Sequence, residues 1–143
     1  SLSFGTLMTA HLSAQDGCEN ALPITCGDEV SGSTVGALVN DGPNCIINIG
    51  SAGAHWYQFI GTGEIVNVST CSEETNFDTK IHVYSGSCGA YTCVAGNDDI
   101  SGTGCSQNAT SSSVTFFSVV DLNYFIVIGG FSSNEGAYAA TLT

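Results

Sequence analysis

The sequence predicts an all-β domain built of antiparallel strands, either a β-sandwich or a barrel. No segment shows a helical stripe of apolar residues between caps. Instead, about nine short β-rich runs are separated by Gly, Ser, Asn and Asp, at spacings typical of sandwiches and barrels. Eighteen glycines in 143 residues supply the turns between these runs.

Each expected strand follows from an apolar or β-branched run between turn residues. Residues 123–130 are apolar on both faces, which predicts a central strand covered on both sides. Residues 64–70 mix their two faces more, so this strand is expected nearer an edge. The other strands are expected within residues 21–26, 29–35, 54–61, 79–85, 91–96, 112–118 and 137–143.

Two of these strands carry side chains whose faces can be assigned from the period of two residues. In the strand at 54–61, Trp56 lies opposite Tyr57 and Phe59, which predicts core packing rather than a flat aromatic platform. In the strand at 79–85, we expect Lys80 and His82 to point outward into solvent.

Residues 1–16 form an N-terminal extension outside the domain, which we place at 17–143. The even positions of residues 1–14 are mostly apolar and the odd positions mostly polar, which is a strand pattern. Fourteen extended residues would span roughly 46 Å, whereas ordinary strands span about 17–20 Å. The apolar stripe of this extended N-terminal strand includes Leu2, Phe4, Met8 and Leu12.

Three interpretations of the extension remain open. The segment could form two consecutive strands of its own sandwich, or it could be a leftover segment that happens to pack. We favour a third, in which the strand enters a neighbouring subunit, as in donor-strand complementation. Repeated head to tail, such a joint does not close and builds a filament, a homopolymer of this chain.

Charge and composition exclude several functions. The formal net charge is −12, and Lys80 is the single basic residue of the chain. No basic patch exists to neutralise phosphates, so nucleic acid is not an expected partner. An anionic membrane surface would repel the chain, and no apolar run approaches the 18 residues that a membrane span needs.

Seven cysteines in so short a chain indicate an oxidising compartment, so the protein is expected to be secreted, either extracellular or on the cell surface. A zinc site is disfavoured because the usual knuckle spacing and histidine partners are missing. Short spacing favours local disulfides, and one cysteine must be free, bonded to another chain, or paired beyond this sequence. The expected pairs are Cys18–Cys26, Cys88–Cys93 and Cys71–Cys105, with Cys45 left over.

Acidic and amide side chains flank two expected strands and could converge at one end of the sheet. Asp78 precedes the strand at 79–85, and Asn97, Asp98 and Asp99 follow the strand at 91–96. Oxygen ligands without basic neighbours suit Ca²⁺, so these four residues are the candidate metal ligands. The alternative is that they form turns by bonding their own backbone.

The sequence gives little support for catalysis. None of the three histidines stands in a nucleophile elbow, a metalloprotease motif or a Cys–His signature. No convergent acid, base and nucleophile can be named, so we expect that the protein is not an enzyme.

A family pattern covers residues 17–143. It consists of the segments FDTKIHVYSGSC, CVAGNDD, SSVTF, NYFIVIGGF and GAYAATLT, in this order, behind a cysteine-rich front. Together these segments resemble the bacterial pre-peptidase C-terminal domains, which are secreted accessory modules. The resemblance implies a jelly-roll-like antiparallel β-sandwich. In related collagen-binding modules this fold is associated with calcium and matrix binding, and the family's acidic positions match Asp78, Asp98 and Asp99, with Asn97.

Two functions follow as hypotheses. The first is a structural subunit of an extracellular bacterial filament, which polymerises by inserting its N-terminal strand into a neighbouring subunit. The second is a secreted accessory binding module for a matrix protein or a polysaccharide, with dependence on Ca²⁺.

Overall fold

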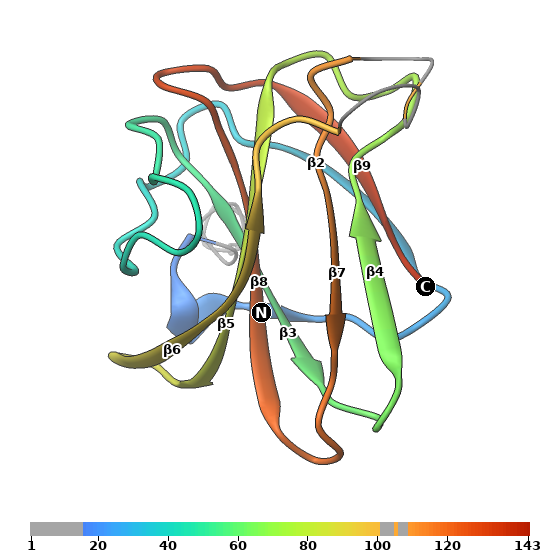
Figure 1. Ribbon diagram of the computed structural model, residues 1–143. Helices are drawn as coiled ribbons and strands as arrows, with labels where there is room; N and C mark the ends of the chain where they lie inside the picture. Colours follow the sequence, from blue (N-terminus) through green and yellow to red (C-terminus); the bar gives the residue numbers. More distant parts are fainter. Residues whose placement is uncertain (1–15, 101–104, 106–108) are drawn as a thin grey trace, which may run out of the picture.

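The computed structural model describes residues 16–100, 105 and 109–143, which fold into two β-sheets packed face to face (Figure 1). The predicted all-β sandwich is therefore confirmed, whereas the expected N-terminal strand lies outside the described residues. No helix in the described part of the chain is long and apolar enough to cross a membrane. The elements are η1 (Cys18–Asn20), β1 (Leu22–Pro23), β2 (Glu29–Ser33), β3 (His55–Ile60), β4 (Ile65–Ser69), β5 (Thr79–Ser87), β6 (Ala90–Asn97), β7 (Ser113–Phe117), β8 (Asn123–Gly130) and β9 (Ala137–Leu142).

The two sheets have the strand orders β1-β3-β8-β5-β6 and β2-β9-β4-β7. Every pairing between named strands is antiparallel except that of the short β1 with β3. β8 lies between β3 and β5, which confirms its prediction as a central strand. β4, expected nearer an edge, is the second strand in from the edge that β7 forms.

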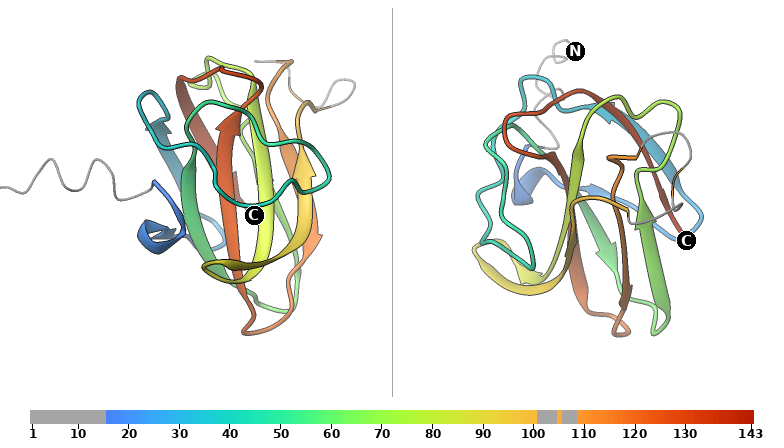
Figure 2. Two further views of the ribbon diagram at one scale, coloured as in Figure 1. Left: turned by 90° about the vertical axis from the view of Figure 1, so that its left-hand side faces the viewer. Right: turned by 45° about the horizontal axis from the view of Figure 1, so that its top comes forward.

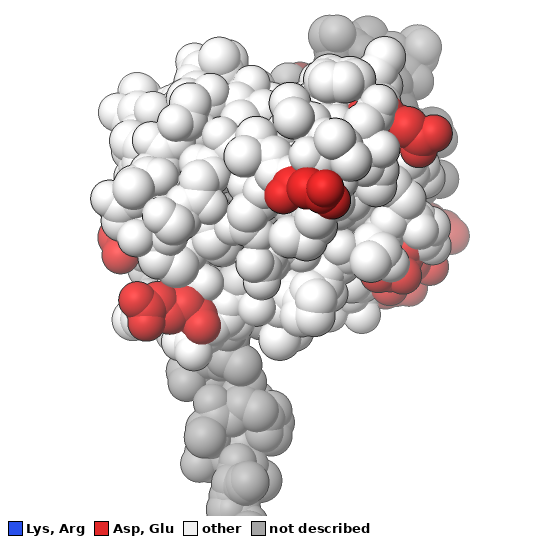
Figure 3. All heavy atoms as spheres, turned by 90° about the horizontal axis from the view of Figure 1, so that it is seen from below, with Lys and Arg blue, Asp and Glu red and all other residues white. Residues whose placement is uncertain are grey.

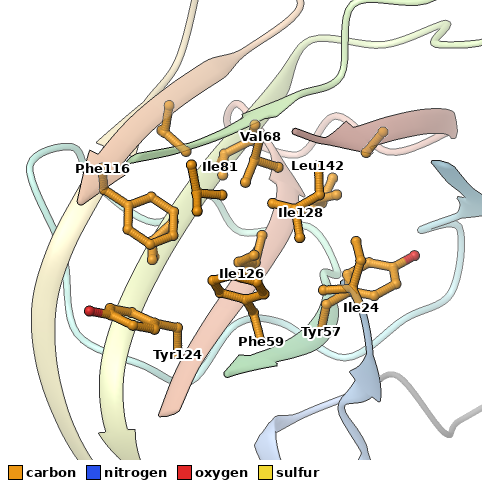
Figure 4. Packing of buried hydrophobic residues seen from close by; sticks show 14 of the residues in the cluster. Ile24, Tyr57, Phe59, Val68, Ile81, Phe116, Tyr124, Ile126, Ile128 and Leu142 are labelled. Atoms are coloured by element: carbon orange, nitrogen blue, oxygen red, sulfur yellow. The ribbon is translucent and has the colours of Figure 1, made fainter. Parts of the chain in front are cut away.

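The main core lies between the sheets. Alternate side chains of the five-stranded sheet, such as Tyr57, Phe59 and Ile126, meet Val68 and Leu142 from the four-stranded sheet (Figure 4). Every fully assigned member of this cluster is at most 7% exposed. At about 1.5–3 kcal/mol for each large apolar side chain buried, this core supplies the main stabilisation of the sandwich.

A third layer covers the outer face of the five-stranded sheet. The long connection between β2 and β3 runs across this face (Figure 2, left). Beneath it lies a second cluster around Trp56, Tyr84 and Phe125, which also includes Cys45 from the connection itself. Trp56 thus faces away from Tyr57 and Phe59, as predicted, and the apolar outer face of β8 finds its cover.

This third layer overturns the expectation that Lys80 and His82 point into solvent. Their exposed fractions are 6% and 3%. The Lys80 Nζ donates a hydrogen bond of 2.8 Å to the carbonyl of Asn48 and lies 5.2 Å from the centre of the Phe131 ring. The His82 Nε2 lies 3.2 Å from the carbonyl of Ile47. Alternation assigned the face correctly but carried no information about the connection that covers it.

Two of the three expected disulfides are wrong. Cys71–Cys105 forms as predicted, but the other bonds are Cys18–Cys88 and Cys45–Cys93, and the free thiol belongs to the exposed Cys26.

The register of the β5–β6 hairpin explains why Cys88 and Cys93 do not pair. Cys88 lies in the turn, because Ser87 pairs with Ala90, whereas Cys93 pairs with Tyr84 further along the ladder. Each sulfur atom therefore meets a different segment that crosses the outer face, either η1 or the connection between β2 and β3.

Candidate metal centre

The hairpin of β5 and β6 brings the predicted acidic residues to one end of the five-stranded sheet. Asp78 directly precedes β5, and Asp98 and Asp99 directly follow β6. Because the strands are antiparallel and Ile81 pairs with Asn97, the start of β5 and the end of β6 lie together. The convergence that the sequence analysis required is therefore present.

The three carboxylates form a close group. One oxygen from each of Asp78, Asp98 and Asp99 lies within 4.8 Å of the other two. The Oδ1 atoms of Asp78 and Asp98 are shielded from solvent and have no hydrogen-bond partner among the described residues. Such buried oxygens cost free energy unless a proton or a cation compensates them.

Burial and mutual repulsion disfavour the charged form of these groups. The pKa of Asp78 is raised to about 6, first by burial and then by the nearby Asp98 and Asp99 carboxylates. Burial, and then the Asp99 carboxylate, also raise the pKa of Asp98. Lys80 lies nearby in sequence, but its ammonium group is bound to the carbonyl of Asn48. The group therefore lacks a cationic side chain close enough to neutralise it fully.

Backbone contacts fix the two loops that carry the carboxylates. The Ser112 hydroxyl contacts the carbonyls of both Thr79 and Asp98, and the N–H of Phe131 donates to the carbonyl of Asp78. The carbonyls of Asp78 and Asp98 are thus used within the protein, and the carboxylates remain available. The Oγ of the neighbouring Ser111 is also buried without a hydrogen-bond partner.

Asn97, the fourth predicted ligand, has another contact in this structure. Its Oδ1 accepts a hydrogen bond of 3.1 Å from the N–H of Ser113 and so links the end of β6 to the start of β7. This contact positions the chain immediately before Asp98.

The ligand set fits a hard divalent cation. All three groups offer oxygen, and the described residues near them contribute neither thiolate nor imidazole to the group. Ca²⁺ takes six to eight oxygen ligands in flexible geometry, so three carboxylates would leave positions for water or for a ligand oxygen. The two unpartnered buried oxygens are the atoms that such an ion would compensate.

A second acidic feature was not predicted. A hollow of about 420 Å³ beside the Cys18–Cys88 disulfide is lined by Asp16, Glu19, Asp41 and Tyr91, among others. These residues come from three separate segments, and no periodic pattern in the sequence links them. The disulfide is what joins η1 to the β5–β6 turn, so the hollow depends on a pairing that the sequence did not predict.

Comparisons with known proteins place the fold. No family model matches the chain, and no curated protein matches it. The pre-peptidase C-terminal domain of a collagenase from Bacillus anthracis is similar in structure, with a TM-score of 0.54 and 14% identity, over 86% of this chain and 94% of that one. CorA, a surface-associated copper-binding protein of Methylomicrobium album BG8, has a TM-score of 0.57 and 8% identity, over 86% and 98%.

The chain therefore has the fold of a pre-peptidase C-terminal domain, and the predicted resemblance is confirmed at the level of the fold. Its three disulfides correspond to the expected cysteine-rich variant and indicate a protein made for an oxidising environment.

Proposed function

We propose that the chain is a secreted, non-enzymatic binding module that holds a divalent cation, Ca²⁺, between Asp78, Asp98 and Asp99. The observation that carries this proposal is the group of three carboxylates with two buried, unpartnered oxygens. The cation would neutralise their repulsion and lock the end of the β5–β6 hairpin against β7.

The hollow beside Cys18–Cys88 supports a polysaccharide as the ligand of this module. Its carboxylates would accept hydrogen bonds from sugar hydroxyls, and the Tyr91 ring offers a stacking surface. A basic protein ligand is the competing outcome, because the same carboxylates would attract lysine or arginine. Binding to neutral polysaccharides that falls in a Tyr91→Ala variant would support the proposal. Binding only to basic proteins would overturn the choice of ligand.

Calorimetric titration of the chelator-treated protein with CaCl₂ tests the cation site. We expect saturable binding and a higher melting temperature for the unmodified protein, and loss of both in an Asp78→Asn, Asp98→Asn double variant. Glu135→Gln is the matched control, since it removes an exposed acid outside the group. Equal Ca²⁺ responses in all three proteins would reject the site.

A filament subunit is the second candidate function. It is favoured by an exposed apolar surface at one end of the sandwich, where the edge strand β7 also ends. In this proposal, residues 1–14 of one copy would join the sheet of the next copy. The inter-sheet core of the described residues is already closed, so the joining strand would extend a sheet edge.

Electron microscopy of the full chain and of a chain without residues 1–14 tests this candidate. Regular filaments from the full chain alone would support it. Isolated particles from both chains at the same concentration would reject it.

A further inference from the structure

One end of the sandwich carries an unusual number of exposed apolar side chains, here called the apolar end. They lie at the facing ends of β3 and β4 and of β7 and β8, with exposed fractions between 39% and 70%. Ile65 and Phe117 are direct cross-strand partners, so these two side chains stand next to each other. The apolar end consists of Ile60, Ile65, Phe117, Val119, Val120 and Leu122.

The apolar end is held by backbone hydrogen bonds between two connections. The N–H of Gly61 donates to the carbonyl of Leu122 at 2.8 Å, and the N–H of Gly63 donates to the carbonyl of Ser118 at 2.8 Å. At Gly61 a Cβ would lie 1.8 Å from the carbonyl oxygen of Val119, so only glycine allows this close approach. The exposed side chains therefore stand on fixed backbone rather than on a loose loop.

The edge strand β7 leads into this surface. Within the described part of the chain, β7 pairs with β4 alone. Ser112 and Ser118, which flank β7, direct their backbone bonds toward the β4 side, to Thr70 and Glu64. Because backbone groups alternate along a strand, those of Thr115 and Phe117 point away from β4, toward the open edge. Such an edge accepts an added strand.

Charge selects the occupant. The chain carries a net charge of −12, so most of its surface repels a second copy. Figure 3 views the sandwich from the end at which β3, β4, β7 and β8 connect, and there acidic groups stand apart on a surface of uncharged residues. Residues 1–14 contain no Asp, Glu, Lys or Arg, although the chain has 13 acidic residues. An uncharged segment can therefore approach the apolar end without repulsion.

We propose that the open edge of β7 and the apolar end form the acceptor site for residues 1–14 of a second copy. Part of the segment pairs with β7, and its apolar stripe of Leu2, Phe4, Met8 and Leu12 covers the apolar end. The segment is longer than the five residues of β7, which is why an apolar surface beyond the strand is needed. This inference rests on the second candidate function and names its acceptor site.

Substitutions in the full chain test the acceptor site, with light scattering and electron microscopy as the readouts. A Phe117→Asp, Val120→Asp double variant places charge on the apolar end, and Thr115→Pro removes a backbone donor from the edge. Both should reduce assembly at least tenfold relative to the unmodified chain. Val35→Asp is the control, because Val35 is 63% exposed but lies in the turn after β2, outside the apolar end.

Buried Trp56 reports whether each variant is folded, since its fluorescence stays blue-shifted only while the outer cluster is intact. Folded variants that assemble as well as the unmodified chain would overturn the acceptor site and leave the filament candidate standing. If the unmodified chain stays monomeric, both the candidate and its acceptor site are overturned.

Discussion

Cys45 and Cys93 are joined by a disulfide that fastens the middle of the connection between β2 and β3 to the edge strand β6. Cys45 is 2% exposed and belongs to the cluster that contains Trp56 and Tyr84. The bond therefore holds down the third layer of the sandwich, which is a segment with almost no regular structure of its own.

Removal of this disulfide should loosen the third layer before the sandwich itself unfolds. In a Cys45→Ala, Cys93→Ala variant we expect the free energy of unfolding to fall by about 2–4 kcal/mol, the usual effect of a disulfide that closes a long loop. Trp56 is the single tryptophan and is fully buried, so its emission should shift to the red in the folded variant. Unchanged emission and stability would show that the connection is held without the bond.

The disulfide pattern gives a second prediction, because Lys80 is the single trypsin site and all three bonds span it. A Cys71→Ala, Cys105→Ala variant is unfolded without reductant and cut by trypsin. Its two fragments should stay joined through Cys18–Cys88 and Cys45–Cys93, and should separate after reduction. Fragments that separate without reductant would indicate the local pairs Cys18–Cys26 and Cys88–Cys93. In the native protein, Cys26 alone should react with a thiol reagent.

The sequence was sufficient wherever local pattern decides the structure. Strand positions followed from alternation and turn residues, and the two apolar faces of residues 123–130 predicted the central place of β8. The meeting of Asp78 with Asp98 and Asp99 followed from pairing two consecutive strands, because a hairpin brings its outer ends together.

The sequence was insufficient where distant segments meet. Residues 34–53 show neither period, so nothing in them indicated that they cover Lys80 and His82. The partner of Cys93 was hidden for the same reason, since it comes from this covering segment rather than from the adjacent turn. The apolar end was also missed, because its side chains come from two connections that are far apart in the chain.

The burial of Lys80 predicts resistance to trypsin in the native state. Its side chain is 6% exposed, and its strand is paired on both sides, with β6 and β8. Cleavage must therefore wait for opening of the sheet, and we expect it to be at least about a thousandfold slower than in the unfolded chain. A Glu74→Lys variant, which places lysine in an exposed loop, should be cut quickly while still folded. Rapid cleavage of the unmodified native protein at Lys80 would contradict the observed burial.

The raised pKa of Asp78 predicts that pH and cation act in opposite directions on stability. The carboxyl has a pKa of about 6 in the folded protein and an ordinary value of 3.8. Its contribution to stability is therefore fully present below about pH 3.8 and is lost as the pH rises through 6. Without cation, the unmodified protein should lose stability relative to Asp78→Asn over this window. Denaturant titrations of both proteins from pH 4 to 7.5 measure this difference.

Ca²⁺ should reverse the effect above pH 6, where it compensates the ionised carboxylates, and should have less effect near pH 4, where protons compete for the same oxygens. In the Asp78→Asn variant both the pH-dependent loss and most of the response to Ca²⁺ should disappear, whereas Glu135→Gln should keep both. If the unmodified protein and Asp78→Asn show parallel pH profiles without cation, the Asp78 carboxylate is not held at a cost in the folded state. The cation would then have no buried charge to relieve, and the argument for a metal at this end of the sheet would fail.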